Sequence, residues 1–333
     1  MLVYVFIVLS FACQSQQYKY LVMKGGGIRG IAYAGAINVL ENKQLLQHFE
    51  KVAGTSVGAI TATMICMGYT ARQIENVMYN LDLATFNDGQ GSFIGGQQRF
   101  RKRYGWYKGK RLEQWIGDMI KQQTGNENLT FGELHKLTKE NPKYKDLYVL
   151  VTNLSKQKLI VFSWESYPDV VVKEAVRASV SIPLYYTAMF IDTTGKISSK
   201  QSKTDNEDIL IDGGLLANYP IEVFNTHEDS VNHVINAYTL GLKLERPEQI
   251  NYAATQEGIA PFQIRSLPNY IGALYNLTIE ELNKSIPHEI EERNTIYIST
   301  SNINPRVRHI TKEQRQLLFN NGATATKAFF ERK

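Results

Sequence analysis

The feature that most constrains the fold of this chain is the pentapeptide Gly54-Thr55-Ser56-Val57-Gly58, a G-x-S-x-G sequence. It stands between a short apolar segment and an apolar helical pattern, which is the context of a nucleophile elbow, a sharp strand-to-helix turn that presents a reactive serine. Gly54 and Gly58 avoid a clash with the turn backbone, and Ser56 is expected in a strained backbone conformation. An ordinary glycine-rich turn before a helix has the same sequence, so the pentapeptide alone does not decide the function.

A second glycine-rich segment, GGGIRG at 25–30, lies between an expected strand at 18–24 and an expected helix at 31–44. It matches a dinucleotide-binding fingerprint, but that function needs an acidic residue at the end of the next strand, where Ser56 stands. Consecutive glycines also leave backbone N–H groups free to converge on a developing negative charge. We therefore predict an oxyanion hole formed by Gly25, Gly26, Gly27, Ile28, Arg29 and Gly30. Arg29 either holds an anionic head group or pairs with a carboxylate.

Asp212 is the best-placed candidate base. It ends an expected strand at 209–211, and Gly213 and Gly214 follow it, so its carboxylate can be approached closely. An aspartate that takes the serine proton directly would form a two-residue catalytic unit with Ser56. Asp-Gly is also a common hairpin turn, which is the structural alternative. The histidines that a catalytic triad would need stand in contexts that suggest no such role: His135, His227, His233, His288 and His309.

Four segments in register, 25–30, 54–58, 178–183 (ASVSIP) and 212–220 (DGGLLANYP), resemble the patatin-like phospholipases over about residues 18–225. The resemblance implies an α/β fold of the modified α/β-hydrolase type, a three-layer sandwich with a mostly parallel central sheet. It assigns Ser56 as nucleophile, Asp212 as base and the first glycine segment as oxyanion hole. It implies that 178–183 supports the site structurally. Lys24, before the glycines, stands where family members vary.

The same resemblance implies hydrolysis of fatty-acyl esters of glycerophospholipids, without a metal or another cofactor. Calcium is not expected, because nothing before Tyr18 is long enough for a calcium-binding membrane module. Acyl transfer on the same scaffold is one alternative. A catalytically idle protein that binds lipid or another partner is a second, although such a protein has no use for a serine, a base and a glycine loop together.

Length and composition limit the number of domains and the classes of function that the chain can have. The 333 residues, 43% hydrophobic and 21% charged, suit one large α/β domain or two modest ones. A net charge of +5 is compatible with anionic surfaces but far from a dedicated nucleic-acid binder, so no nucleic-acid partner is expected. Two cysteines, Cys13 and Cys66, allow no disulfide framework beyond one bridge and are too few for a cysteine-based zinc site. We divide the chain into 1–17, a catalytic domain at 18–225, and a C-terminal helical extension at 226–333 packed on that domain.

The apolar run at 2–12 is too short to span a bilayer as a helix. Its length suits a signal peptide, with Ala12-Cys13 as a lipoprotein processing site, although no Lys or Arg precedes the run. The alternatives are an N-terminal strand or a misassigned start. A processed leader would make the protein secreted or lipid-anchored; otherwise it would be cytoplasmic with peripheral membrane contact.

Residues 87–111 are expected to form a long glycine-rich loop. Within it, 99–111 interleaves Arg and Lys with Phe, Tyr and Trp, a composition that suits an anionic membrane surface. The alternative is a solvated loop whose aromatic residues pack on the core. Elsewhere the patterns predict helices at 70–81, 112–123, 131–140 and 170–179, paired strands at 147–153 and 158–164, further strands at 231–239 and 295–299, and a polar turn at 195–208.

Overall fold

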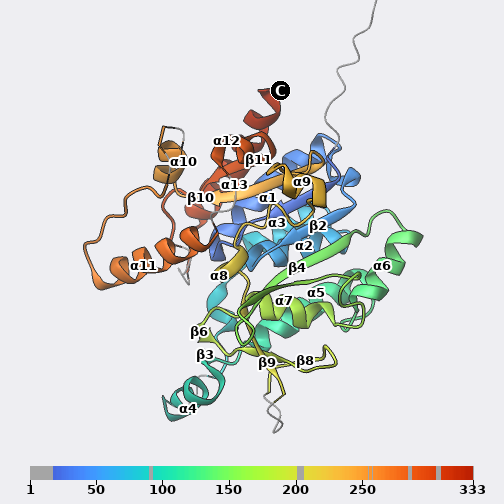
Figure 1. Ribbon diagram of the computed structural model, residues 1–333, viewed down its shortest axis with the longest axis vertical. Coiled ribbons are helices and arrows are strands. Elements are labelled where there is room, and N and C mark those ends of the chain that lie inside the picture. Colours follow the sequence, from blue (N-terminus) through green and yellow to red (C-terminus); the bar gives the residue numbers. More distant parts are fainter. Residues whose placement is uncertain are drawn as a thin grey trace, which may run out of the picture.

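A mixed sheet of nine strands, counted over the described residues, runs through the middle of the molecule (Figure 1). This computed structural model describes residues 18–89, 93–200, 206–253, 255–256, 258–283, 287–304 and 309–332. In sheet order the strands are β11 (Thr295–Ser299), β10 (Thr239–Glu245), β1 (Tyr20–Met23), β2 (Lys51–Gly54), β4 (Asp146–Asn153), β9 (Asp208–Asp212), β7 (Met189–Ile191) and β8 (Ile197–Ser198). The ninth, β5 (Lys158–Phe162), also pairs with β4.

The strands from β11 to β4 run parallel, whereas β9, β7 and β8 continue the sheet antiparallel. Alternate residues of the central strands enter two separate apolar clusters. Leu21 and Val52 face one side of the sheet, and Val22 and Ala53 face the other. Burial on both faces is what a parallel sheet covered by helices requires. The predicted fold class, an α/β sandwich with a mostly parallel central sheet, is confirmed.

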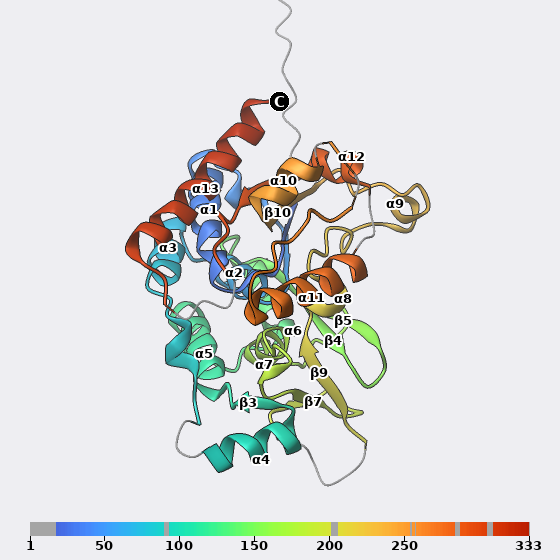
Figure 2. The ribbon, with the colours of Figure 1, turned by 90° about the vertical axis from the view of Figure 1, so that its left-hand side faces the viewer.

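Helices cover both faces of the sheet (Figures 1 and 2). Residues of seven described α-helices enter the larger apolar cluster: α1 (Ile31–Asn42), α2 (Val57–Cys66), α3 (Ala71–Tyr79), α5 (Lys110–Thr124), α6 (Phe131–Glu140), α7 (Val172–Ser179) and α13 (Lys312–Glu331). On the other face the cover comes from Ala217, at the end of the short helix α8 (Gly214–Ala217), and from Tyr219, Ile221 and Ile235. The short helix α9 (His227–Val231), between Ile221 and Ile235, buries none of its residues. The remaining described α-helices are α10 (Pro247–Ala253), α11 (Leu267–Leu282) and α12 (His288–Glu291), and the 3-10 turns are Gly27–Gly30, Leu46–His48, Leu83–Phe86 and Glu292–Asn294.

The backbones of the first and last long helices approach each other closely. A Cβ atom on Gly35 of α1 would lie 1.9 Å from the Phe319 carbonyl oxygen, and one on Gly322 of α13 would lie 1.9 Å from the Ala32 carbonyl oxygen. Only glycine fits at these two positions, so α13 is an integral part of the same core as α1.

The prediction of a loop over residues 87–111 is wrong in its centre. Residues 93–103 form helix α4 (Phe93–Arg103), and β3 (Gly105–Tyr107) pairs with β6 (Leu184–Tyr186) in a second, two-stranded sheet. Gly96 lies against the Trp106 ring, and Arg99 Nε donates to the Trp106 carbonyl oxygen at 3.0 Å. These contacts order the segment, and no periodic apolar pattern in the sequence signals them.

The strand predicted over 231–239 is also wrong. Thr226 and Asp229 form a capping box that starts helix α9, Val231 is exposed, and β10 begins only at Thr239. The buried leucines of the strand are Leu240, Leu242 and Leu244, so the strand lies almost entirely beyond the predicted range. Residues 226–333 supply the expected helices, but they also contribute β10 and β11 to the central sheet. Residue 225 is therefore not a structural boundary.

Local capping signals are confirmed. Thr70 caps α3, and Thr130 with Glu133 forms the predicted capping box of α6. The helix expected at 170–179 and the strand pair at 147–153 and 158–164 are present as α7, β4 and β5. The expected leader at 1–17 lies outside the described residues, as do positions 201–205 of the expected polar turn. None of the described helices combines the length and the apolarity needed to cross a bilayer.

Candidate active site

Ser56 occupies the tight turn between β2 and α2. Its backbone has φ 55° and ψ −123°, a conformation that L residues rarely adopt. A Cβ atom on Gly54 would lie 2.3 Å from the Gly58 carbonyl carbon, and one on Gly58 would lie 2.4 Å from the Met23 carbonyl oxygen. Both flanking positions therefore require glycine. The turn has the strained geometry that the pentapeptide predicts.

Ser56 and Asp212 meet although 156 residues separate them. Ser56 Oγ donates to Asp212 Oδ2 at 2.9 Å, and the two residues are only 8% and 4% exposed. β2 and β9 pair with successive stretches of the same edge of β4, Gly54 opposite Val149 and Asp212 opposite Val151, so the carboxyl ends of β2 and β9 lie close together. The second carboxylate oxygen, Oδ1, accepts the Gly214 N–H at 2.7 Å, which fixes the orientation of the carboxylate.

Burial raises the pKa of Asp212 to about 6, although the hydrogen bonds from the Gly214 N–H and the Ser56 hydroxyl act in the opposite direction. An ionised Asp212 is consequently a stronger base than an exposed aspartate. At neutral pH the carboxylate is mostly ionised and able to accept the proton of the adjacent serine hydroxyl.

The end of α7 holds both residues of this pair. The Ser56 N–H donates to Ser179 Oγ at 3.0 Å, and the Ser179 hydroxyl donates to the Leu150 carbonyl oxygen at 2.7 Å. The Asp212 N–H donates to the Ser181 carbonyl oxygen at 3.0 Å. Segment 178–183 therefore contacts the backbone of both residues, a position consistent with the supporting role that the family resemblance implies for it.

Arg177 is a supporting residue that the sequence analysis missed. Its side chain is fully buried and donates to the carbonyl oxygens of Lys108, Gly109 and Thr187 and to Ser181 Oγ. Burial lowers the pKa of this guanidinium. The signal in the sequence was an arginine that follows Ala175 and Val176 directly before the ASVSIP segment.

The first glycine segment lies beside Ser56. A Cβ atom on Gly25 would lie 3.4 Å from Ser56 Cβ, and the Gly25 N–H donates to the Asn218 carbonyl oxygen at 2.9 Å. The Gly25 donor is thus occupied, so Gly25 provides space rather than a free N–H group. The described residues offer no acceptor to the N–H groups of Gly26 and Gly27, which leaves these two as candidate donors.

Of the other predicted loop residues, Ile28 is fully buried, and Gly30 packs so closely on Val57 that a Cβ atom there would lie 2.3 Å from Val57 Cγ2. Arg29 Nε donates to the Gly26 carbonyl oxygen at 3.0 Å. Burial lowers the pKa of Arg29, while the nearby carboxylates of Glu245 and Glu280 raise it. Arg29 therefore stabilises the first glycine segment through its hydrogen bond to Gly26, and its charge is attracted by the two carboxylates. Gly213, on the base side, packs against the Leu150 carbonyl oxygen, 2.2 Å from a Cβ atom built there.

Helix α11 and the residue after it contact two segments of the site: Lys24, directly before the first glycine segment, and the residues that follow Asp212. Buried Lys24 forms ion pairs of 2.9 Å with Glu245 of β10 and with Glu280 of α11. Burial lowers the pKa of Lys24, but the two carboxylates outweigh this effect and raise it above its usual value. Asn283 accepts the Asn218 N–H and lies 3.4 Å from the Gly214 carbonyl oxygen. Figure 2 shows α11 alongside α8.

No histidine among the described residues contacts Ser56. His135, for example, stacks on Trp164 and lies 2.9 Å from Asp146 Oδ1. Nor does any group of three or more His, Cys, Asp or Glu side chains in the described ranges have the arrangement to hold a metal ion.

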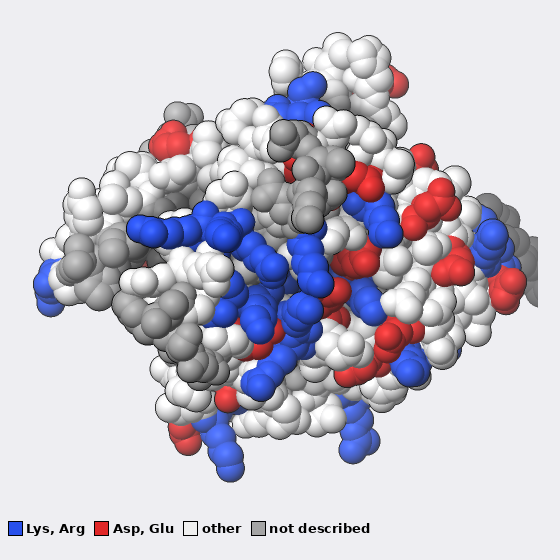
Figure 3. All heavy atoms as spheres, turned by 90° about the horizontal axis from the view of Figure 1, so that it is seen from below, with Lys and Arg blue, Asp and Glu red and all other residues white. Residues whose placement is uncertain are grey.

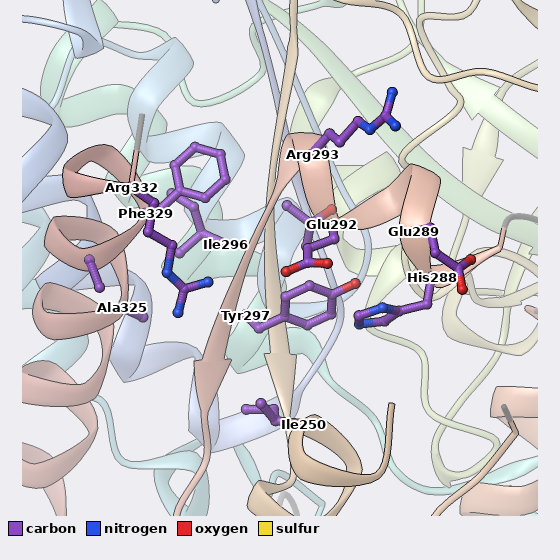
Figure 4. A pocket seen from close by; sticks show the side chains of 12 residues that line it. Ile250, His288, Glu289, Glu292, Arg293, Ile296, Tyr297, Ala325, Phe329 and Arg332 are labelled. Carbon is purple, nitrogen blue, oxygen red and sulfur yellow. The ribbon is translucent and has the colours of Figure 1, made fainter. Parts of the chain in front are cut away.

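A cavity of about 640 Å³ lies elsewhere in the described part of the chain (Figure 4). α12, β11 and α13 line it, and His288 stacks on Tyr297 at its wall. It includes Thr295 at the amino end of β11, whereas Ser56 follows the carboxyl end of the parallel strand β2. This cavity is therefore separate from the serine site.

Comparisons with known proteins agree with this architecture. A sequence model of the patatin-like phospholipase family matches residues 21–225. A Bacillus subtilis (strain 168) protein named "Uncharacterized protein YqhO" is 28% identical over 321 residues, 93% of this chain and 97% of that protein. "Probable lipid hydrolase 463L" of Invertebrate iridescent virus 6 is 26% identical over 224 residues, 67% of this chain and 69% of its own. The crystal structure of VipD from Legionella pneumophila superimposes with a TM-score of 0.60 at 17% identity, covering 95% of this chain and 67% of that one.

A helix-covered mixed sheet with a serine on a strained strand-to-helix turn defines an α/β protein of the hydrolase type. The chain belongs to the patatin-like phospholipase family. Family membership and the lipid hydrolase relative support a lipid-hydrolysing enzyme. The likeness to VipD shows that the fold is shared.

Proposed function

We propose that the protein is a serine lipid acyl hydrolase that cleaves fatty-acyl esters of glycerophospholipids with Ser56 and Asp212 as a catalytic dyad. The observation that carries this proposal is the 2.9 Å hydrogen bond between Ser56 Oγ and Asp212 Oδ2, on a strained turn beside a glycine loop. A nucleophile hydrogen-bonded to an oriented base is the arrangement that covalent acyl transfer requires.

In the first half-reaction, Ser56 Oγ attacks the acyl carbonyl carbon while Asp212 accepts the hydroxyl proton. The N–H groups of Gly26 and Gly27 stabilise the oxyanion, and each such donor contributes about 3 kcal/mol to the transition state. Asp212 then returns the proton to the departing lysolipid oxygen, which leaves an acyl ester on Ser56. In the second half-reaction Asp212 accepts a proton from a water molecule that attacks this ester, and it returns that proton to the departing Ser56 Oγ as the fatty acid is released.

A fluorophosphonate probe tests the proposal directly. We expect one probe molecule per chain, attached to the peptide that contains Ser56, together with loss of fatty-acid release from phospholipid vesicles. The phosphonate traps Ser56 Oγ because it mimics the tetrahedral oxyanion. Mass spectrometry locates the label, and product analysis separates free fatty acid from an acyl group transferred to another alcohol. A label on a different serine would refute the dyad.

We also propose that residues 99–111 contact the membrane surface. Phe100 lies in α4 and is 42% exposed, and Tyr104 directly follows α4 and is 43% exposed. Leu184 of β6, which pairs with Gly105 of β3, is 60% exposed. Arg101 and Lys102 are exposed on the same helix. Apolar tips among cations suit the boundary between lipid head groups and acyl chains.

Reversing three charges of this segment, Arg101→Glu, Lys102→Glu and Arg103→Glu, is expected to weaken binding to anionic vesicles at least tenfold. Each surface cation contributes about 1 kcal/mol near an anionic membrane, and reversal replaces attraction with repulsion. Vesicle sedimentation at two salt concentrations measures the effect, which should shrink at high salt. Binding equal to that of the unchanged protein would exclude a membrane role for the segment.

A further inference from the structure

A hollow of about 350 Å³ lies between α4 and the start of α5. Its lining residues are Gly95, Gln98, Arg99, Lys102, Arg103, Lys108 and Lys110. Figure 3 views this end of the molecule from below and shows lysine and arginine side chains gathered around a depression near its centre. None of the seven residues forms a hydrogen bond with Ser56 or Asp212 in the part of the chain that is described.

Five of the seven lining residues are cations, and none is acidic. Lys102, Lys108 and Lys110 form no ion pair with any carboxylate among the described residues. Like charges around one hollow repel one another, and the repulsion is stronger near low-dielectric protein than in bulk water. An anion in the hollow would offset this repulsion.

The backbone that carries these cations is held in place on several sides. Arg99 Nη2 donates to the Gly89 carbonyl oxygen at 2.7 Å. The Asp88 carboxylate accepts the N–H groups of Gly109 at 2.6 Å and Lys110 at 2.8 Å. Buried Arg177 donates to the Lys108 carbonyl oxygen at 3.1 Å. Because these hydrogen bonds already fix the backbone around the hollow, the lysine side chains can converge on a ligand without the entropic cost of ordering a loop.

We propose that this hollow binds a phosphate monoester group that carries two negative charges. Such a group offers three acceptor oxygens and a charge of about −1.5 to −2 at neutral pH. Arg103 can meet it with a planar fork of N–H donors, and Lys102 and Lys108 with point charges. The group comes either from a phosphorylated lipid head group or from a free phosphate in solution. This site goes beyond the proposed hydrolysis, because binding there needs no reaction at Ser56.

The test measures binding alone, with vesicles of ether-linked phosphatidylcholine that contain no cleavable acyl ester. One set carries ether-linked phosphatidic acid, a phosphate monoester. The other carries ether-linked phosphatidylserine at twice the mole fraction, which matches the formal surface charge. The double variant Lys102→Gln with Lys108→Gln is compared with a control, Lys136→Gln with Lys139→Gln, two exposed lysines on α6. Thermal unfolding verifies that both variants are folded.

We expect the unchanged protein to bind phosphatidic acid vesicles at least tenfold more tightly than the charge-matched phosphatidylserine vesicles. The Lys102–Lys108 variant should lose this preference and the control should keep it. Equal binding to both vesicle types, or a preference that survives in the Lys102–Lys108 variant, would overturn the proposal. Inorganic pyrophosphate distinguishes the two sources of the phosphate group. If micromolar pyrophosphate displaces the protein from phosphatidic acid vesicles, the hollow is a site for free phosphate. If the preference for phosphatidic acid is unaffected by millimolar pyrophosphate, the hollow is a lipid head-group site.

Discussion

Replacing Ser56 with alanine will reduce fatty-acid release from phospholipid by about 10⁴-fold or more, because no acyl-enzyme can form without Oγ. The substitution leaves the turn intact. Gly54 and Gly58 still provide its space, and the N–H group at position 56 still donates to Ser179 Oγ. We therefore expect an unfolding temperature close to that of the unchanged protein. The measurement is turnover of a soluble chromogenic fatty-acyl ester together with calorimetry.

A matched serine controls for nonspecific effects. Ser230 is exposed on α9, and its hydroxyl donates only to the Thr226 carbonyl oxygen. Ser230→Ala should retain full activity. If Ser56→Ala kept more than about a tenth of the turnover, another residue would have to be the nucleophile.

Replacing Asp212 with asparagine should lower kcat by about 10²- to 10⁴-fold, the range that a general base contributes. The amide has nearly the same shape as the carboxyl group and can keep both hydrogen bonds, accepting from the Gly214 N–H and donating to Ser56 Oγ. It cannot accept the serine proton. A variant that kept most of its activity would exclude Asp212 as the base.

The same variant is expected to be more stable above pH 6. Burial raises the pKa of Asp212 to about 6 in the folded protein, against about 3.9 in the unfolded chain. The folded state therefore binds more protons between these values, and the free energy of unfolding falls as the pH rises from about 4 to about 6. Because each pKa unit corresponds to about 1.4 kcal/mol, the buried carboxylate costs up to about 3 kcal/mol above pH 6, a cost that asparagine avoids.

The pKa of Asp212 also sets the pH profile of activity. Below about pH 6 the protonated carboxyl group cannot act as a base, so kcat/KM on the soluble ester should fall tenfold per pH unit. The residual activity of Asp212→Asn should lack this inflection. An inflection that persists in the variant would assign the titration to another group.

The part of the site that could be predicted from sequence is the part that short segments encode. Glycines two residues before and two residues after Ser56 predict a tight turn. The two glycines after Asp212 predict a carboxylate that can be approached closely. Thr130 with Glu133 encodes a helix start in the same local way. In each case the residues that interact are within a few positions of one another, so spacing carries the geometry.

What could not be predicted depends on contacts between distant segments. Arg177 supports the site through the carbonyl oxygens of Lys108 and Gly109, some 70 positions away. Lys24 meets Glu280 of α11 across 256 positions. Helix α4 is ordered by Trp106 and Gly89, so its own sequence, with two glycines, reads as a loop. The wrong strand prediction at 231–239 has the same cause. Val231 and Val234 give the segment a strand-like apolar pattern, but in the structure Leu240, Leu242 and Leu244 are the residues buried in the sheet.

The position of β10 beside β1 also has a consequence for how the chain folds as it is synthesised. Tyr20 pairs with Thr239, so β1 lacks one of its two neighbours until 219 more residues (239 minus 20) have been added. At about 5–20 residues per second this interval is roughly 10–40 s, during which one edge of a buried strand stays open. Open edges invite pairing with other chains. We therefore expect the nascent chain to be prone to pairing with other chains at this edge until β10 has been synthesised.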